Sequence, residues 1–208
     1  MTDDGNRGLI GALQHIAQGA PDDGLTLGEF TDALDERAFG VILFALALPV
    51  CIPFLYVIPQ IVALPMLAVA AQMAAGRGEP WMPRKFAERR IDKPALERMA
   101  RTGKRWFGWL EVIARPRLHF LSGPTGERVV GAFLCLFCAS VLVPLPLTNT
   151  TPGIATAIAS LGLLTRDGFL ILFGLLMGTA WILLLAVGGP ALLYAIIDFV
   201  RGLVNGGA

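Results

Sequence analysis

Residues 38–76 read AFGVILFALALPVCIPFLYVIPQIVALPMLAVAAQMAAG and contain no Asp, Glu, Lys, Arg or His. The tract is about twice as long as the ~20 apolar residues that one transmembrane helix needs. Prolines interrupt it near its middle, and a proline inside a helix removes a backbone donor and clashes with the preceding turn. We therefore expect two apolar helical segments that form a hairpin in a membrane.

Two further tracts carry no charged residue, namely 129–165 and 168–197. The first of these resembles 38–76 in length and in its central prolines, so it predicts a second hairpin. The other tract is long enough for one span and a shorter segment after Gly188-Gly189-Pro190. The predicted fold is an all-α integral membrane protein with two proline-broken helical hairpins, a C-terminal transmembrane helix pair, and amphipathic N-terminal and central helices.

The overall composition excludes several classes of protein. The chain has 208 residues, 55% of them hydrophobic and only 16% charged, with a net charge of +1 and a mean hydropathy of +0.65. A soluble domain usually carries about 25% charged residues. Disorder is excluded by the high content of large apolar residues, and nucleic-acid binding is not expected at a net charge near zero.

Basic residues are concentrated between the first two apolar tracts. Residues 77–128 hold 13 of the 17 Lys and Arg residues, and the positive-inside rule places such a connection in the cytoplasm. The first 37 residues lack a basic segment followed by an apolar stretch, so we expect no secretory signal and a retained N-terminal tail. We expect a multi-pass protein of the cell inner membrane with five segments: an acidic, amphipathic, cytoplasmic 1–35, a first hairpin 36–76, a basic interfacial connection 77–126, a second hairpin 127–165, and C-terminal transmembrane segments 166–208.

The N-terminal segment and the basic connection both predict amphipathic helices. Thr26 and Glu29 have the spacing of a capping box, and Leu27, Phe30 and Leu34 then share one helical face. In the connection, tryptophans lie among the basic residues, as in the aromatic belt of a membrane interface. A helix interrupted at Pro116 is predicted over 105–121. Arg115 and Arg117 fit either a headgroup pocket or ordinary solvated charges.

The first two tracts begin alike, which suggests an internal repeat. Glu36-Arg37-Ala38-Phe39-Gly40 matches Glu127-Arg128-Val129-Val130-Gly131 at an offset of 91 residues. The same offset pairs Pro53 with Pro144, and a two-residue insertion then pairs Pro59 with Pro152. We interpret the match as a duplicated unit, although apolar segments also resemble one another by chance. Internal repeats are common in membrane transport proteins.

The proline breaks leave two architectures open. Pro59 and Pro152 are predicted as the first residues of new helices, with Thr151 as an N-cap. The half-helices of about 15–18 residues are short for a bilayer core of ~30 Å. Each hairpin is therefore either a full hairpin that turns at the far surface or a re-entrant hairpin that turns inside the protein. The polar residues 148–151 fit an exposed loop or the lining of a cavity.

Several short motifs together resemble a known family. They are the leading Glu-Arg-x-x-Gly of each unit, Gly76-Arg77 before Pro80-Trp81-Met82-Pro83, Arg115-Pro116-Arg117, Pro144-Leu-Pro-Leu-Thr-Asn149, and Gly162-Leu-Leu-Thr-Arg166-Asp167-Gly168. In order and spacing, over residues 25–203, they resemble the exopolysaccharide synthesis ExoD family. The resemblance implies a bacterial inner-membrane protein linked to exopolysaccharide production, and it implies no particular chemical reaction.

Catalytic and metal-binding motifs are scarce. His15 and His119 have no metal-ligand spacing, so we expect no metal and no cofactor. Cys135 and Cys138 have a redox spacing but lie in an apolar helix, where small packing residues are expected. There is no Walker loop and no nucleophile elbow. Gly174-Leu-Leu-Met-Gly178 predicts close helix packing or a homodimer face.

The candidate binding residues are charged residues at the edges of the tracts and polar residues in the second proline break. They are Arg37, Arg128, Thr148, Asn149, Thr151, Arg166 and Asp167. Arginines facing a cavity, with the positive ends of helices near the breaks, would bind an anionic headgroup or sugar phosphate. The alternative is that the charged pairs only mark the interface, with the arginines reaching outward.

The predicted function is to bind or translocate an anionic or lipid-linked saccharide, in a transporter-like protein surrounded by membrane lipids. One alternative is a membrane-embedded lipid-phosphate hydrolase or transferase that uses Asp167 or Glu127. It would need convergent titratable groups with a nucleophile or metal, so we expect a binding protein rather than an enzyme. The other alternative is a structural subunit of a polysaccharide-synthesis complex.

Overall fold

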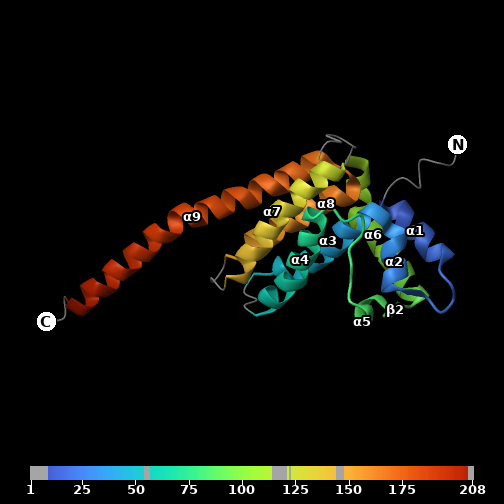
Figure 1. The fold of residues 1–208 in the computed structure, drawn as a ribbon, viewed down its shortest axis with the longest axis horizontal. Coiled ribbons are helices and arrows are strands. Elements are labelled where there is room, and N and C mark those ends of the chain that lie inside the picture. Colours follow the sequence, from blue (N-terminus) through green and yellow to red (C-terminus); the bar gives the residue numbers. More distant parts are fainter. Residues whose placement is uncertain (1–8, 54–56, 114–120, 122, 144–147, 206–208) are drawn as a thin grey trace.

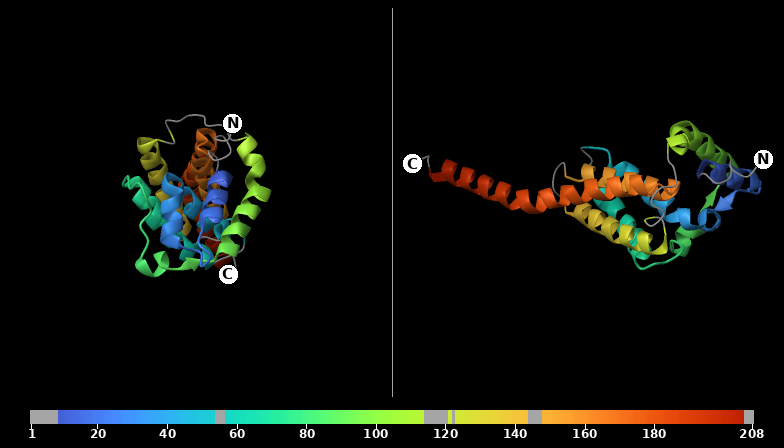
Figure 2. Two further views of the ribbon diagram at one scale, coloured as in Figure 1. Left: turned by 90° about the vertical axis from the view of Figure 1, so that its right-hand side faces the viewer. Right: turned by 90° about the horizontal axis from the view of Figure 1, so that it is seen from above.

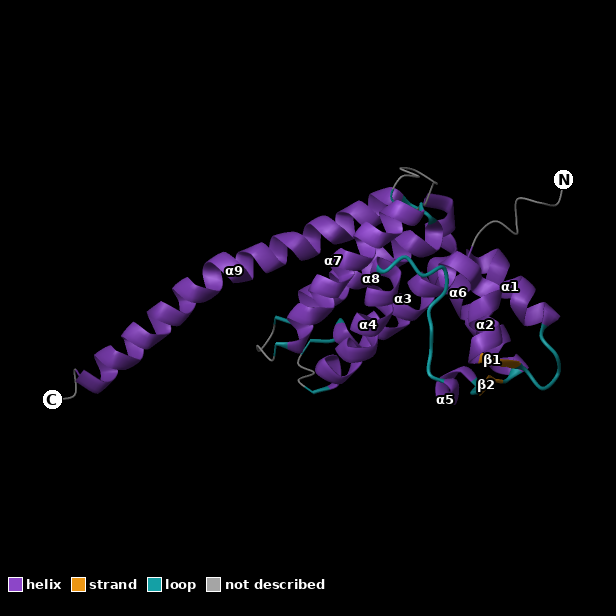
Figure 3. Cartoon of the chain, viewed as in Figure 1, coloured by secondary structure: helices purple, strands orange, loops and turns teal. Residues whose placement is uncertain are grey.

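The computed structural model describes residues 9–53, 57–113, 121, 123–143 and 148–205. Almost all of the regular structure is helical, and the two strands are short (Figure 3). The elements in chain order are α1 Leu9–Gly19, β1 Leu25–Thr26, α2 Leu27–Leu34, a 3-10 turn Asp35–Arg37, α3 Ala38–Val50, α4 Ile58–Ala74, α5 Arg84–Ala87, β2 Arg90–Ile91, α6 Lys93–Ile113, α7 Pro124–Leu142, α8 Thr150–Thr165 and α9 Gly168–Asn205.

The N-terminal helices and α6 form a small cluster with its own core, beside the longer helical bundle (Figure 2). The predicted amphipathic face of α2 is confirmed, since Phe30 and Leu34 are buried there. Leu96 and Ala100 of α6 are buried in the same core, while the residues between them are exposed. The predicted amphipathic central helix is therefore present, but it begins at Lys93. Arg115, Pro116 and Arg117 lie outside the described residues.

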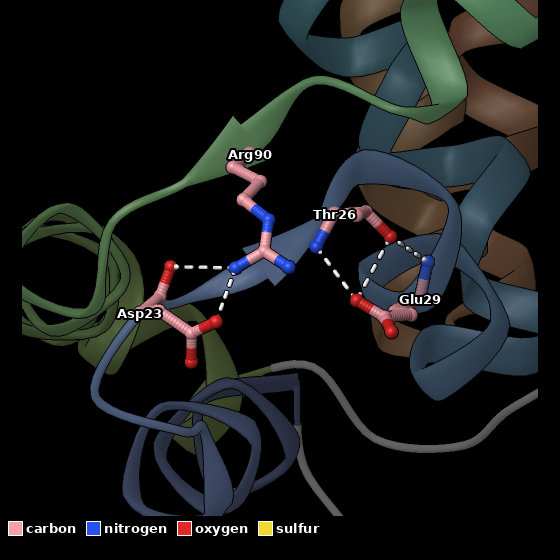
Figure 4. Close-up of polar contacts among 4 residues, drawn as sticks. All are labelled: Asp23, Thr26, Glu29 and Arg90. Carbon is pink, nitrogen blue, oxygen red and sulfur yellow. Dashed lines mark hydrogen bonds and ion pairs between the residues drawn. The ribbon is translucent and has the colours of Figure 1, made fainter.

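A polar strap, formed by residues 22–26, ties the N-terminal segment to the start of α6 (Figure 4). Strand β1 pairs antiparallel with β2. The Arg90 guanidinium forms an ion pair with Asp23, and the Lys93 Nζ lies 3.1 Å from Asp22 Oδ1. The predicted capping box is also present, because the Glu29 N–H donates to Thr26 Oγ1 at 3.1 Å and the Thr26 N–H donates to Glu29 Oε2 at 2.8 Å.

We expect the strap to show in the titration of Asp23. The hydrogen bond from Arg90 lowers the pKa of that carboxyl below its ordinary value. The ion pair therefore stabilises the fold above the ordinary carboxyl pKa, and this contribution is lost as the pH falls through the lowered value. In Arg90→Ala the pKa of Asp23, followed by NMR, should return to the ordinary range. Arg89→Ala, which removes a neighbouring exposed charge, should leave it unchanged; equal shifts in both variants would contradict the assignment.

Helices α3, α4, α7 and α8 form a bundle in which the first helix of each hairpin packs on the second helix of the other. Helix α3 contacts α4 and α8, and α7 contacts the same two helices. Glycines allow the closest approaches. A Cβ at Gly40 would lie 3.1 Å from the Ser160 carbonyl oxygen, and a Cβ at Gly131 would lie 3.0 Å from the Ala70 carbonyl oxygen. Gly40 and Gly131 therefore let the first helix of each hairpin pack closely on the second helix of the other.

Helix α9 runs beside α7 and α8 and then continues past the bundle (Figure 1). The expected second segment after Gly188-Gly189-Pro190 is wrong, because one helix passes through these residues. Such residues are tolerated in apolar helices because local adjustments satisfy the freed backbone groups. Gly174 and Gly178 pack inside the chain, on α8 and on the Phe137 ring. Helix α7 and residues Gly168–Gly189 of α9 are long and apolar enough to cross a membrane.

The starts of the second helices differ from the expectation by one or two residues. Pro59 lies in the first turn of α4, as predicted. Helix α8 begins at Thr150, so Asn149 is its N-cap and Thr151 lies inside the first turn. Pro152 is accommodated there because the first N–H groups of a helix have no intrahelical acceptor.

Candidate functional site

The two proline breaks, between α3 and α4 and between α7 and α8, lie at the same end of the bundle. We call this the break end. Pro59 of α4 and Pro152 of α8 are both fully buried. A Cβ at Gly153 would lie 3.0 Å from the backbone carbonyl carbon of Val50, so the end of α3 abuts the start of α8. The Trp181 Nε1–H of α9 donates to the Thr148 carbonyl oxygen at 3.1 Å. The end of α3, the start of α8 and the middle of α9 therefore come together at the break end.

The break end contains two buried amide oxygens without hydrogen-bond partners among the described residues. Asn149 is only 9% exposed, and its Oδ1 has no hydrogen-bond partner among the described residues. The same is true of the buried Oε1 of Gln60, in the first turn of α4. Leaving a buried polar atom unpaired costs about 1–3 kcal/mol, and such groups commonly mark a place for water or a ligand. Thr148 and Thr151, on either side of Asn149, are half-buried.

The opposite end of the bundle, which we call the charged end, carries the predicted arginines. Arg128 lies over the C-terminal end of α4, where a Cβ at Gly76 would be 2.6 Å from the Arg128 Cζ. The Arg128 side chain is exposed, and Arg37 is half-buried in the 3-10 turn before α3. These positions fit either predicted role, because an arginine at the rim can meet an anionic headgroup or only mark the interface.

Arg166 and Asp167 connect α8 to α9. Arg166 has the left-handed conformation that ends a helix, with φ at 53°. Asp167 is 6% exposed, and its Oδ1 accepts a hydrogen bond of 2.9 Å from the Phe169 N–H at the start of α9. A carboxylate in this position caps a helix, so the Asp167 side chain is already engaged structurally.

The structure does not bring the seven predicted residues together. Arg37, Arg128, Arg166 and Asp167 lie at the charged end, whereas Thr148, Asn149 and Thr151 lie at the break end. The helix between the two sets, α8, has 16 residues, and at 1.5 Å per residue it separates them by roughly 24 Å. One small ligand therefore cannot contact both sets.

Sequence reasoning did not single out Gln60 and Trp181. The sequence does contain a feature that marks Gln60 as a candidate. It is an amide inside an uncharged tract, directly after a proline predicted to start a helix. No sequence feature marks Trp181, because its contact with Thr148 joins segments that are 33 residues apart. No cluster of three His, Cys, Asp or Glu side chains is found in the described part of the chain, and the three cysteines are unpaired thiols.

Comparison with known proteins places the chain in a family. A family model described as "Exopolysaccharide synthesis, ExoD" matches residues 9–187. Protein ExoD of Rhizobium meliloti is 28% identical over 193 residues, which cover 90% of this chain and 80% of that protein. The uncharacterized protein slr1875 of Synechocystis is 28% identical over 177 residues, 80% of this chain and 82% of that protein. No solved structure matches. The chain belongs to the ExoD family, and this membership implies involvement in exopolysaccharide synthesis.

Proposed function

We propose that this protein is a multi-pass inner-membrane protein whose hairpins turn inside the membrane, and that the break end binds an anionic or lipid-linked saccharide of exopolysaccharide synthesis. The observation that carries the proposal is the depth of the break end. Trp181, which contacts Thr148, is 13 residues after Gly168 along α9. That distance is about 20 Å of helix, whereas the bilayer core is ~30 Å thick.

Helix α9 supports this depth, because its uncharged tract continues to residue 197, well beyond Trp181. If the charged end lies at one interface, the breaks stop roughly 6–10 Å short of the other, as counted along α8 and α9. Irregular backbone at such a depth is tolerated where it is buried in protein or lines a polar cavity. The buried, unpaired amide oxygens of Gln60 and Asn149 are the groups that such a cavity would offer to sugar hydroxyls.

Equivalent contacts in the two hairpins support the duplication on which this architecture rests. Helix α4 ends with Gly76 N–H bonded to Met73 and Arg77 N–H bonded to Gln72. Helix α8 ends in the same way, with Arg166 N–H bonded to Leu163 and Asp167 N–H bonded to Gly162. The helix ends are 90 residues apart. This spacing pairs Pro59 with Asn149, in place of the pairing with Pro152 that the sequence suggested.

Exopolysaccharide output of cells that carry single substitutions tests the binding role. Removing an unpaired buried amide should leave the stability of the fold unchanged or slightly raised, because the cost of its unmet hydrogen bond disappears. Asn149→Ala and Gln60→Ala should nevertheless lower exopolysaccharide output severalfold at equal protein level. A structural subunit would instead tolerate both substitutions.

The matched control is Ser160→Ala, which removes a buried hydroxyl that also lacks a partner among the described residues but lies closer to the charged end of α8. It should retain output. Wild-type output from both amide variants, or an equal loss in Ser160→Ala, would rule out a binding role for the break end.

A further inference from the structure

An apolar furrow separates α6 from α3 on the outside of the bundle. It consists of two cavities, of about 360 Å³ and about 250 Å³, that share Val41, Ala45 and Met99 in their walls. The larger cavity lies among α1, α3, α6 and α8, and the smaller one lies between α2 and α3. We call the two together the α3–α6 furrow.

The walls of the furrow are apolar, with a single charge. Arg98 is the only charged side chain in either wall among the described residues, and Thr102 lies beside it. Leu48 and Met99 line the furrow and remain 51% and 42% exposed. Sites for small molecules have this character, with mostly apolar walls and a few placed polar groups, in volumes of roughly 300–1,000 Å³.

The shape of the furrow suits a hydrocarbon chain. Along α3 its walls run from Ala38, beside the charged end, to Leu48, a distance of about 15 Å at 1.5 Å per residue. Among the described residues, the cluster core reaches α3 only at Ala38 and Val41, so the part of the furrow near Leu48 lies beyond that core. An apolar cavity does not hold water well and takes up apolar ligands instead.

The position of the charge indicates which lipid would bind. Arg98 and Thr102 are four residues apart on α6 and therefore lie on one helical face. Exposed Arg101, Lys104 and Arg105 follow on the same helix. Basic residues beside an apolar surface attract anionic headgroups, each by about 1 kcal/mol near the membrane surface.

We propose that the α3–α6 furrow binds an anionic glycerophospholipid, with an acyl chain along α3 and the headgroup phosphate on Arg98 and the Thr102 hydroxyl. This site is separate from the break end and does not depend on a saccharide substrate. It would fix the cytoplasmic cluster to the bundle through a lipid, since direct packing between α6 and α3 is sparse.

Native mass spectrometry of the full chain, purified from nanodiscs of equal parts phosphatidylglycerol and phosphatidylcholine, tests the proposal. The wild type should retain phosphatidylglycerol in preference. Arg98→Ala should lower that preference about fivefold, and Ala45→Phe should reduce retention of both lipids by filling the furrow. Lys104→Ala is the charge-matched control on α6, and Ala68→Phe is the size-matched control at an exposed position of α4; both should retain lipid as the wild type does.

Three outcomes would overturn the proposal. An equal preference for phosphatidylglycerol in Arg98→Ala and Lys104→Ala would contradict the headgroup site. Equal lipid retention in Ala45→Phe and Ala68→Phe would contradict the acyl-chain site. Absence of retained lipid, with a wild-type dimer that Ala45→Phe dissociates, would assign the furrow to a second copy of the chain. The measurement does not involve exopolysaccharide output. A negative result for lipid binding would therefore leave the break-end proposal unaffected.

Discussion

Gly131→Ala is expected to lower the stability of the protein by about 1–3 kcal/mol, the usual cost of adding a methyl group to a tightly packed contact. A Cβ at this position would lie 2.5 Å from the Ala74 backbone nitrogen and 3.0 Å from the Ala70 carbonyl oxygen. Neither atom belongs to a flexible side chain, so α7 has to move away from α4. The higher helix propensity of alanine, worth up to about 1 kcal/mol, is too small to compensate. Thermal unfolding of the purified protein in detergent measures the difference.

Gly188→Ala is the matched control, because it makes the same change inside a helix. No atom lies within 4 Å of a Cβ at Gly188. Its stability should therefore stay equal or rise by up to about 1 kcal/mol through helix propensity. Unfolding temperatures that are equal for the two variants would show that α4 and α7 do not approach as closely as described.

A cysteine in the break end is expected to react at least tenfold more slowly with a membrane-impermeant maleimide, added from the periplasm, than a cysteine near the end of α9. The proposed depth leaves Thr150 roughly 6–10 Å below the far interface, whereas Tyr194, 13 residues beyond Trp181, lies outside the core. The probes are Thr150→Cys and Tyr194→Cys. Thr150 is half-buried and Tyr194 is exposed, and labelling is followed by gel shift in cells.

Both probes need a background in which the native cysteines are silent. Cys51 is the important one, because it ends α3 at the break end, and Cys51→Ser removes it. Cys135 and Cys138 remain within α7 as internal references for unreacted thiols. Equal labelling rates for Thr150→Cys and Tyr194→Cys would mean that the hairpins turn at the far surface, which would exclude the re-entrant form.

Sequence reasoning predicted the elements well where local chemistry determines them. The capping box at Thr26 and Glu29 is present because both partners lie within one helical turn. The helical character of 38–50 and 58–74 follows from uncharged runs between proline breaks. The prediction of a helix end at Gly188-Gly189-Pro190 was wrong. These residues often break helices locally, but α9 continues through them without interruption.

The candidate site was harder to predict because it depends on which helix ends meet. Arg128 lies at the start of the apolar tract 129–165, and Asn149 lies in its central break. The predicted half-helix between them already implied a separation, but the sequence does not show which side chains of the other hairpin lie beside each residue. The meeting of Thr148 with Trp181 likewise depends on the packing of α9 against α8. The sequence therefore indicates where helices end but not which helix ends lie beside one another.

The last turns of α4 and α8 each contain one left-handed residue, but the two residues differ in type and in what lies beside them. The left-handed residue is Gly76 in the first hairpin, with φ at 77°, and Arg166 in the second, with φ at 53°. The left-handed φ at 76 favours glycine, and a Cβ there would have to displace the Arg128 guanidinium of the other hairpin. Arg166 is exposed. An arginine at position 76 would therefore meet a second cation, because the Arg128 guanidinium already lies over the end of α4.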